Sequence, residues 1–168
     1  MLNVQYAIAE SPLGRLLVGA TERGVCSVCL GDDDAELEQC LRLQYPGADV
    51  QRNDAAVAGH VEAILRYLRG QVRHANLELD VQGTAFQWRV WRELQAIPYG
   101  ETRTYSAIAD AIGRPKAVRA VANACARNRA ALIIPCHRAV RIGGALGGYR
   151  WGIERKRTLL EREAARSG

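Results

Sequence analysis

The stretch ALIIPCHRAV, residues 131–140, begins as a typical core segment and ends in three reactive side chains. Its apolar run, Leu132–Ile134, predicts a buried strand. Pro135 ends this run, and Cys136, His137 and Arg138 follow directly. A nearby imidazole or cation stabilises a thiolate, which is the nucleophilic form of cysteine. Cys136 is therefore a candidate nucleophile.

These residues alone leave two interpretations of Cys136 open. Adjacent side chains on a strand diverge, so a contact between Cys136 and His137 requires a turn after Pro135 or a bridging water. The alternative is an inert, buried cysteine. Two enzyme classes fit poorly. A phosphatase loop would need arginine at position 142, where Ile142 stands, and a cysteine peptidase usually has its histidine far away in the chain.

The remaining thiols predict neither a disulfide framework nor a metal site. The chain has 5 cysteines, an odd number that suggests free thiols in a reducing environment. Cys26 and Cys29 form a C-x-x-C pair, but zinc needs about four ligands and no second pair is present. Cys40 and Cys125 lie within helical patterns and are expected in the core. We therefore expect no metal.

The positive charge of the chain lies in its second half. Residues 1–82 carry 7 arginines and 12 acidic residues, a net charge of −5, whereas residues 83–168 carry 16 basic and 6 acidic residues, a net charge of +10. A basic half suggests a polyanionic partner, nucleic acid first, and the alternative is a solvated basic surface. No apolar run approaches about 18 residues and no secretory signal is recognisable, so we expect no membrane contact and a cytoplasmic location.

The acidic half predicts a small sheet with helices. Three strand-like runs separated by turn signals lie at residues 4–10, 14–20 and 24–30 and favour an antiparallel meander. Further patterns predict helices over residues 32–45 and 55–70 and a strand over residues 77–81. The fold class expected from these patterns is α/β (α+β).

The domain boundary is expected near residue 82. Thr84 and Gln87 fit a capping box, which predicts a helix from there to about Ala96. The charge changes sign at the same place. The two expected domains are residues 1–82, a sheet with helices, and residues 83–168, which carry the candidate nucleophile.

The basic half contains a pattern typical of a helix-turn-helix. One helix is predicted over roughly Ser106–Ile112, Gly113–Pro115 break it, and a second helix runs to about Arg127. Arg119, Asn123 and Arg127 recur at i, i+4 and i+8 and therefore share an outer face. With the charge distribution, this face predicts nucleic-acid binding. The candidate DNA-binding residues are Arg119, Ala120, Asn123, Arg127 and, beside the thiol, Arg138.

Two longer strings resemble the O6-alkylguanine-DNA alkyltransferases. They are IPYGETRTYSAIADAIGRPKAVRAVANACARNRAALIIPCHRAV, residues 97–140, and GGYRWGIERKRTLLEREA, residues 147–164. With GDDDAEL in the first half, the chain looks most like the methyltransferase domain of bacterial Ada-type proteins. The resemblance implies a winged-helix-like second domain. It also implies irreversible transfer of an alkyl group from O6 of guanine, or O4 of thymine, to a cysteine, with base flipping, one turnover and no cofactor.

The resemblance implies roles for the residues that match the family's motifs. Cys136 matches the nucleophile, His137 the base that activates it through a water, and Glu163 the carboxylate that holds this histidine. Asn128 matches the residue that braces the turn between recognition helix and active loop. Tyr105 matches the tyrosine that helps rotate the nucleotide and bonds the guanine.

Further matches concern the flipped base and its pocket. Arg119 matches the finger that fills the gap left by this base. The carbonyls of Cys136 and Ala139 and the N–H of Arg150 match groups that read it. Tyr149 matches a residue lining the alkyl pocket, and Trp151 is expected to narrow that pocket unless it only packs on the last helix. By the residues alone, Glu163 is not preferred over Glu161.

The expected partner is double-stranded DNA carrying O6-alkylguanine or O4-alkylthymine, bound by a monomer. Ala139 and Arg150 depart from the usual valine and serine, but backbone roles do not depend on those side chains. Two other classes compete with an alkyltransferase: a non-catalytic protein that binds alkylated DNA, and a thiol hydrolase that turns over repeatedly. The presence of Cys136 argues against the first class.

Overall fold

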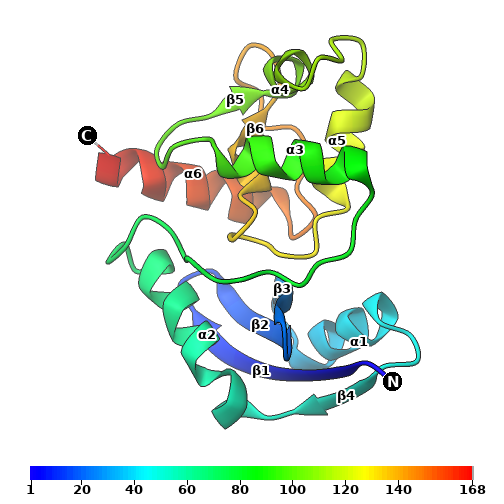
Figure 1. The fold of residues 1–168 in the computed structure, drawn as a ribbon. Helices are drawn as coiled ribbons and strands as arrows, with labels where there is room; N and C mark the ends of the chain where they lie inside the picture. The colour runs from blue at the N-terminus through cyan, green and yellow to red at the C-terminus, as the bar shows by residue number, and fades with distance from the viewer. Residues whose placement is uncertain (168) are drawn as a thin grey trace. The chain divides into compact units, whose positions relative to one another are not determined.

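The computed structural model describes residues 1–167, which form two compact units (Figure 1). The first unit comprises Met1–Val81 and the short segment Arg129–Ile133, and the second comprises Gln82–Asn128 and the chain from Ile134 on. That residues 1–82 and 83–168 are two domains stays a prediction. Within the described residues, no helix has the length and apolar character needed to cross a membrane.

A four-stranded sheet forms the centre of the first unit. Its strands are β1 (Asn3–Ser11), β2 (Gly14–Thr21), β3 (Gly24–Gly31) and β4 (Asp49–Arg52). The order is β3-β2-β1-β4, with the first three antiparallel, as the turn signals predict, and β4 parallel to β1. β4 was not predicted because only one of its four residues is buried, which leaves no alternating pattern.

The strand expected over residues 77–81 is not formed. Leu79 makes only an isolated bridge to Val25. The segment contributes two backbone hydrogen bonds to that edge, from Val25 N to Glu78 O and from Asp80 N to Val25 O. A segment with strand-like composition therefore runs along the edge of the sheet and bonds to Val25 without forming a strand.

Two helices complete the first unit. α1 (Asp34–Gln44) contacts β2 and β3, and α2 (Asp54–Leu68) contacts β1 and β2 (Figure 1). Both begin at a side-chain cap: Asp33 accepts from Ala35 N at 2.9 Å and Asn53 accepts from Ala56 N at 3.1 Å. Such caps satisfy backbone N–H groups that have no partner inside the helix.

The second unit begins with α3 (Ala85–Gln95). Thr84 and Gln87 form the predicted capping box, with both reciprocal hydrogen bonds at 3.0 Å. The buried face of α3 carries Trp91, whose indole N–H donates to Ala124 O at 2.9 Å. This bond ties α3 to the helix that presents the predicted DNA-binding stripe.

The predicted helix-turn-helix is present as α4 (Tyr105–Ala111) and α5 (Val118–Ala126), which pack on each other and on α3. Gly113 opens the connection with a φ of 74°, a conformation that glycine adopts without strain. On α5, Val121, Ala124 and Cys125 face inward. The exposed residues of α5 are Arg119, Ala120, Asn123 and Ala126.

The segment expected as a buried strand, Leu132–Ile134, forms turns instead. Leu132 has a φ of 74°, a region that non-glycine residues rarely occupy and that no strand contains. The prediction failed because a short apolar run signals burial but not backbone conformation. All three residues are buried.

The chain then forms the elements that surround Cys136. A short 3₁₀ helix, η1 (Cys136–Arg138), leads into β6 (Ala139–Val140). β6 pairs in parallel with β5 (Arg103–Thr104), just before α4. The final helix, α6 (Ile153–Ser167), contacts η1.

Candidate active site

Cys136 lies at the start of η1 in a buried turn. Its backbone N–H donates to Ile134 O at 2.8 Å, and Arg138 N–H donates to Pro135 O at 3.0 Å. The side chains of Cys136 and His137 therefore leave a tight turn rather than a strand. Cys136 is only 4% exposed.

Asn128, directly after the C-cap residue Arg127 of α5, connects this turn to the predicted recognition helix. Its Nδ2 donates to Ile134 O at 2.8 Å and lies 3.4 Å from Cys136 Sγ. Burial raises the pKa of the Cys136 thiol to about 11, although the Asn128 bond and the charges of Lys156 and Arg150 act in the opposite direction. At neutral pH the thiol is therefore protonated and needs a base.

His137 meets Glu163 of α6 although the two are far apart in the chain. His137 Nε2 lies 2.9 Å from Glu163 Oε2. Arg138 binds the same carboxylate through both oxygens, with Nε at 2.9 Å from Oε1 and a second N–H at 3.0 Å from Oε2. All three side chains are buried. Glu163 is thus the buried anion of a His–Glu–Arg cluster, as bidentate pairing with arginine favours.

The protonation states follow from this cluster. Burial alone would raise the pKa of Glu163, but hydrogen bonds and charges from His137 and Arg138 outweigh it and hold the pKa far below its ordinary value. Burial lowers the pKa of His137. Because an ionised carboxylate only accepts, Nε2 of a neutral His137 must donate to Glu163. Nδ1 is then the basic nitrogen of the imidazole.

Arg138 was expected on the DNA-binding face, and its position contradicts that expectation. The residue is 2% exposed, its Nη1 donates to Ile97 O at 2.8 Å, and its guanidinium lies over the Tyr99 ring. A side chain enclosed in this way cannot reach a phosphate. Its charge instead compensates Glu163, which allows that carboxylate to stay ionised in the interior.

Lys156 belongs to the site although the sequence did not single it out. It is fully buried, and its Nζ donates to Ala139 O at 2.6 Å, to Gly148 O at 3.1 Å and to the Tyr105 hydroxyl at 3.4 Å. It sits in the basic run 155–157, which looks like a solvated face. The spacing along α6 could have indicated this position, because Lys156 lies two helical turns before Glu163 and therefore on the same, buried side of the helix.

Tyr105 is held between Lys156 and the loop before α6. Gly147, with a φ of 72°, passes so close that a Cβ there would stand 2.9 Å from the Tyr105 hydroxyl oxygen. Only glycine allows this approach. Burial raises the pKa of Tyr105 to about 12, so its hydroxyl remains a proton donor at neutral pH.

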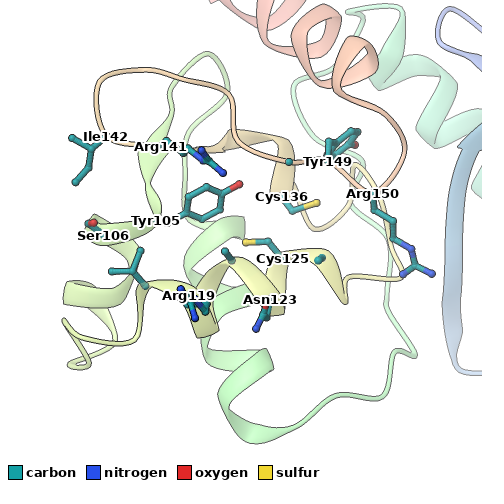
Figure 2. A pocket seen from close by; sticks show the side chains of 14 residues that line it. Tyr105, Ser106, Arg119, Asn123, Cys125, Cys136, Arg141, Ile142, Tyr149 and Arg150 are labelled. Atoms are coloured by element: carbon teal, nitrogen blue, oxygen red, sulfur yellow. The ribbon is translucent and has the colours of Figure 1, made fainter.

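A cavity of about 840 Å³ opens in front of the thiol (Figure 2). Of the predicted site residues, it brings together Tyr105, Arg119, Asn123, Cys136, Tyr149 and Arg150. Ala120 on α5 and Arg127 at its C-cap are exposed and lie outside the lining. Cys125, expected as a core residue, is buried and also borders this cavity.

Trp151 and Ala139, both expected at the pocket, are not among the lining residues. Trp151 is 7% exposed and packs edge-on against Tyr149, with ring centroids 5.2 Å apart. Trp151 therefore packs against Tyr149, which lines the cavity, without lining the cavity itself. The carbonyl of Ala139 accepts from Lys156 and keeps one further lone pair for another donor.

The described part of the chain, residues 1–167, contains no cluster of three or more His, Cys, Asp or Glu side chains suited to a metal ion. Cys26 and Cys29 are buried, reduced cysteines of β3. The cavity is lined by the Cys136 thiol and the Tyr105 hydroxyl, and the buried groups next to them are a neutral imidazole held by a carboxylate and an ammonium hydrogen-bonded to that hydroxyl. They suit attack by sulfur on a carbon atom whose leaving group needs a proton.

Two family models match nearly the whole chain. Residues 4–81 match the ribonuclease-like domain and residues 85–165 the DNA binding domain of 6-O-methylguanine DNA methyltransferase. The methylated-DNA–protein-cysteine methyltransferase of Mycolicibacterium paratuberculosis is 38% identical over 98% of this chain and 94% of its own length. A crystal structure of the Mycobacterium tuberculosis O6-methylguanine methyltransferase aligns with a TM-score of 0.82 at 37% identity, covering 98% of this chain and 95% of that one.

A further relative is longer than this chain. The bifunctional transcriptional activator/DNA repair enzyme Ada of Escherichia coli is 52% identical over 97% of this chain but only 46% of its own length. The chain therefore spans about half the length of this relative. The Mycobacterium tuberculosis protein has also been crystallised in complex with DNA, and that structure aligns with a TM-score of 0.83 at 36% identity, covering 98% of this chain and 94% of that one.

Proposed function

Because the chain belongs to the 6-O-methylguanine DNA methyltransferase family, we propose that it repairs DNA by moving a methyl group from O6 of guanine to Cys136. The observation that carries this proposal is a buried thiol that faces a cavity and is followed by a histidine held by Glu163. O4-alkylthymine is proposed as a second substrate. We further propose that the protein works as a monomer in the cytoplasm.

The proposed reaction is a single displacement at the alkyl carbon. His137 Nδ1 accepts the thiol proton through a water, and Cys136 Sγ forms a bond to the methyl carbon as the carbon–O6 bond breaks. The electron pair of that bond stays on the guanine, which must gain one proton. Tyr105, bonded to Lys156, supplies that proton or a hydrogen bond. The net result is a thioether on Cys136 and an unmodified guanine that remains part of the DNA.

DNA is the proposed partner, bound by the second unit. Arg119 and Asn123 on α5 and Arg127 at its C-cap are exposed, and Arg119 and Asn123 also border the cavity. Arginines at the mouth of a cavity suit a phosphate backbone from which one base is turned inward. We assign DNA binding and chemistry to the domain of residues 83–168.

The proposal predicts one methyl group gained per protein molecule, at Cys136, and no second turnover. A thioether has no leaving group that this site could release, so the reaction is stoichiometric. Intact-protein mass after mixing with O6-methylguanine DNA, followed by peptide mapping, tests this. No mass gain despite DNA binding would indicate a non-catalytic binding protein, and repeated turnover without mass gain would indicate a hydrolase.

Replacing Arg119 by alanine is expected to slow repair of duplex DNA much more than transfer from the free modified base. Only the duplex requires unstacking of a base, which takes a few kcal/mol, and an inserted side chain offsets part of it. The measurement is the pair of second-order rate constants. Equal slowing on both substrates would assign Arg119 to another task.

A further inference from the structure

Two thiols border the cavity in front of the η1 turn, and the proposed methyl transfer uses only one of them. Cys125 and Cys136 both belong to the cavity lining and are 7% and 4% exposed. Figure 2 shows both side chains at the cavity, with Cys125 reaching into it from α5 and Cys136 from the turn. Cys125 therefore stands at the reaction site without a role in the proposed reaction.

Asn128 fixes the two thiols relative to each other. Its backbone N–H donates to Cys125 O at 3.3 Å, and its side-chain Nδ2 lies 3.4 Å from Cys136 Sγ. The same Nδ2 donates to Ile134 O at 2.8 Å, which holds the turn. Burial raises the pKa of Cys125, and the charge of Cys136 raises it further, so the two sulfurs lie within electrostatic reach of each other. One buried residue thus joins both thiols to a common frame.

Both thiols are protonated at neutral pH, and this decides which kind of reagent can join them. Burial raises the pKa of Cys136 to about 11 and also raises that of Cys125. Oxidation to a disulfide begins with a thiolate, and a metal ion must displace the protons of both ligands. A hydroxide of trivalent arsenic meets neither obstacle, because each of its hydroxides leaves with one thiol proton as water.

We propose that Cys125 and Cys136 form a dithiol site for trivalent arsenic. With the phenyl compound, PhAs(OH)₂ and two thiols give PhAs(S–Cys)₂ and two molecules of water. Two As–S bonds and two O–H bonds form, while two As–O bonds and two S–H bonds break. Arsenic stays trivalent, so no oxidant or reductant takes part. The product is neutral, which suits a buried site, and the cavity of about 840 Å³ has room for the phenyl group.

The bridge also has a consequence for repair. It occupies Cys136 Sγ, so the loaded protein gains no methyl group from O6-methylguanine DNA. A small dithiol, which takes the arsenic back, restores the transfer. This consequence rests on the proposed function, whereas binding of arsenic does not. The two are therefore measured separately.

The test uses phenylarsine oxide, which hydrates to PhAs(OH)₂, with excess glutathione as a monothiol competitor. Dissociation constants are measured by intact mass under non-denaturing conditions for wild type, Cys125→Ala and Cys136→Ala. Cys40→Ala is the matched control, because Cys40 and Cys29 are a second pair of neighbouring cysteines outside the cavity lining. Gln44 Nε2 lies 3.7 Å and 3.9 Å from their sulfurs. Thermal melting verifies that each variant is folded.

We expect wild type to bind one arsenic with two sulfur ligands, counted in the arsenic K-edge absorption spectrum. Cys125→Ala and Cys136→Ala should each weaken binding about 100-fold or more, because the second As–S bond is intramolecular and gains from a high effective concentration. Cys40→Ala should bind as wild type does. Since the spectrum is taken on wild type, it tests the site even where a variant does not fold.

Three results overturn the site: wild-type affinity in either cavity variant, a single sulfur ligand in wild type, or a loss of binding in Cys40→Ala alone. The methyl readout is separate. A protein that binds arsenic at both cavity thiols but gains no methyl group in the absence of arsenic confirms the site and refutes the proposed function.

Discussion

Replacing Cys136 by alanine abolishes methyl transfer, while the affinity for duplex DNA stays within about threefold of the wild-type value. The thiol is 4% exposed inside the cavity. The residues proposed to contact DNA are exposed on α5 and at its C-cap, and none of them bonds to the thiol. Transfer is measured by intact mass with O6-methylguanine DNA, and affinity by titration of labelled duplex.

Cys125→Ala is the matched control for this experiment, because Cys125 is a second buried thiol that borders the same cavity. Burial raises the pKa of Cys125 as it does that of Cys136, but no imidazole follows it in the chain. We expect the Cys125 variant still to gain one methyl group. A methyl group found on Cys125 in the Cys136 variant would refute the assignment of the nucleophile.

Replacing Glu163 by alanine lowers the free energy of unfolding at neutral pH by about 3–5 kcal/mol, as is typical when one partner of a buried ion pair is removed. The carboxylate accepts from Arg138 through both oxygens and from His137. Without it, the buried Arg138 cation loses the carboxylate that accepts two of its hydrogen bonds. Chemical denaturation followed by circular dichroism measures the change, and Glu161→Ala, an exposed position on the same helix, is the control.

The pH dependence of the free energy of unfolding separates the contribution of the Glu163 charge from that of its packing. Since the folded-state pKa of Glu163 is lowered, its ionised form contributes stability that is fully present above the unfolded pKa of about 4.3 and is lost as the pH falls towards the folded value. Glu163→Gln should therefore differ most from wild type near pH 7 and progressively less below about pH 4. A difference that does not change with pH would assign the effect to packing alone.

Local sequence rules determined much of the secondary structure. The meander of β1 to β3, the capping box of α3 and the α4–α5 pair were predicted because each depends on residues within a few positions of one another. The polar stripe on α5 followed from helical spacing in the same way. The adjacency of Cys136 and His137 also marked a candidate nucleophile without any knowledge of the fold.

Only the tertiary structure decided which distant groups meet. Nothing local distinguishes Glu163 from Glu161, yet packing of α6 on η1 buries the first beside His137 and leaves the second exposed. The same packing turned Arg138 inward and placed Lys156 against Tyr105. Such contacts depend on how helices pack, and a buried charge is tolerated only where packing also brings its counter-charge. The sequence alone therefore identified the reactive thiol, whereas the fold selected the groups that surround it.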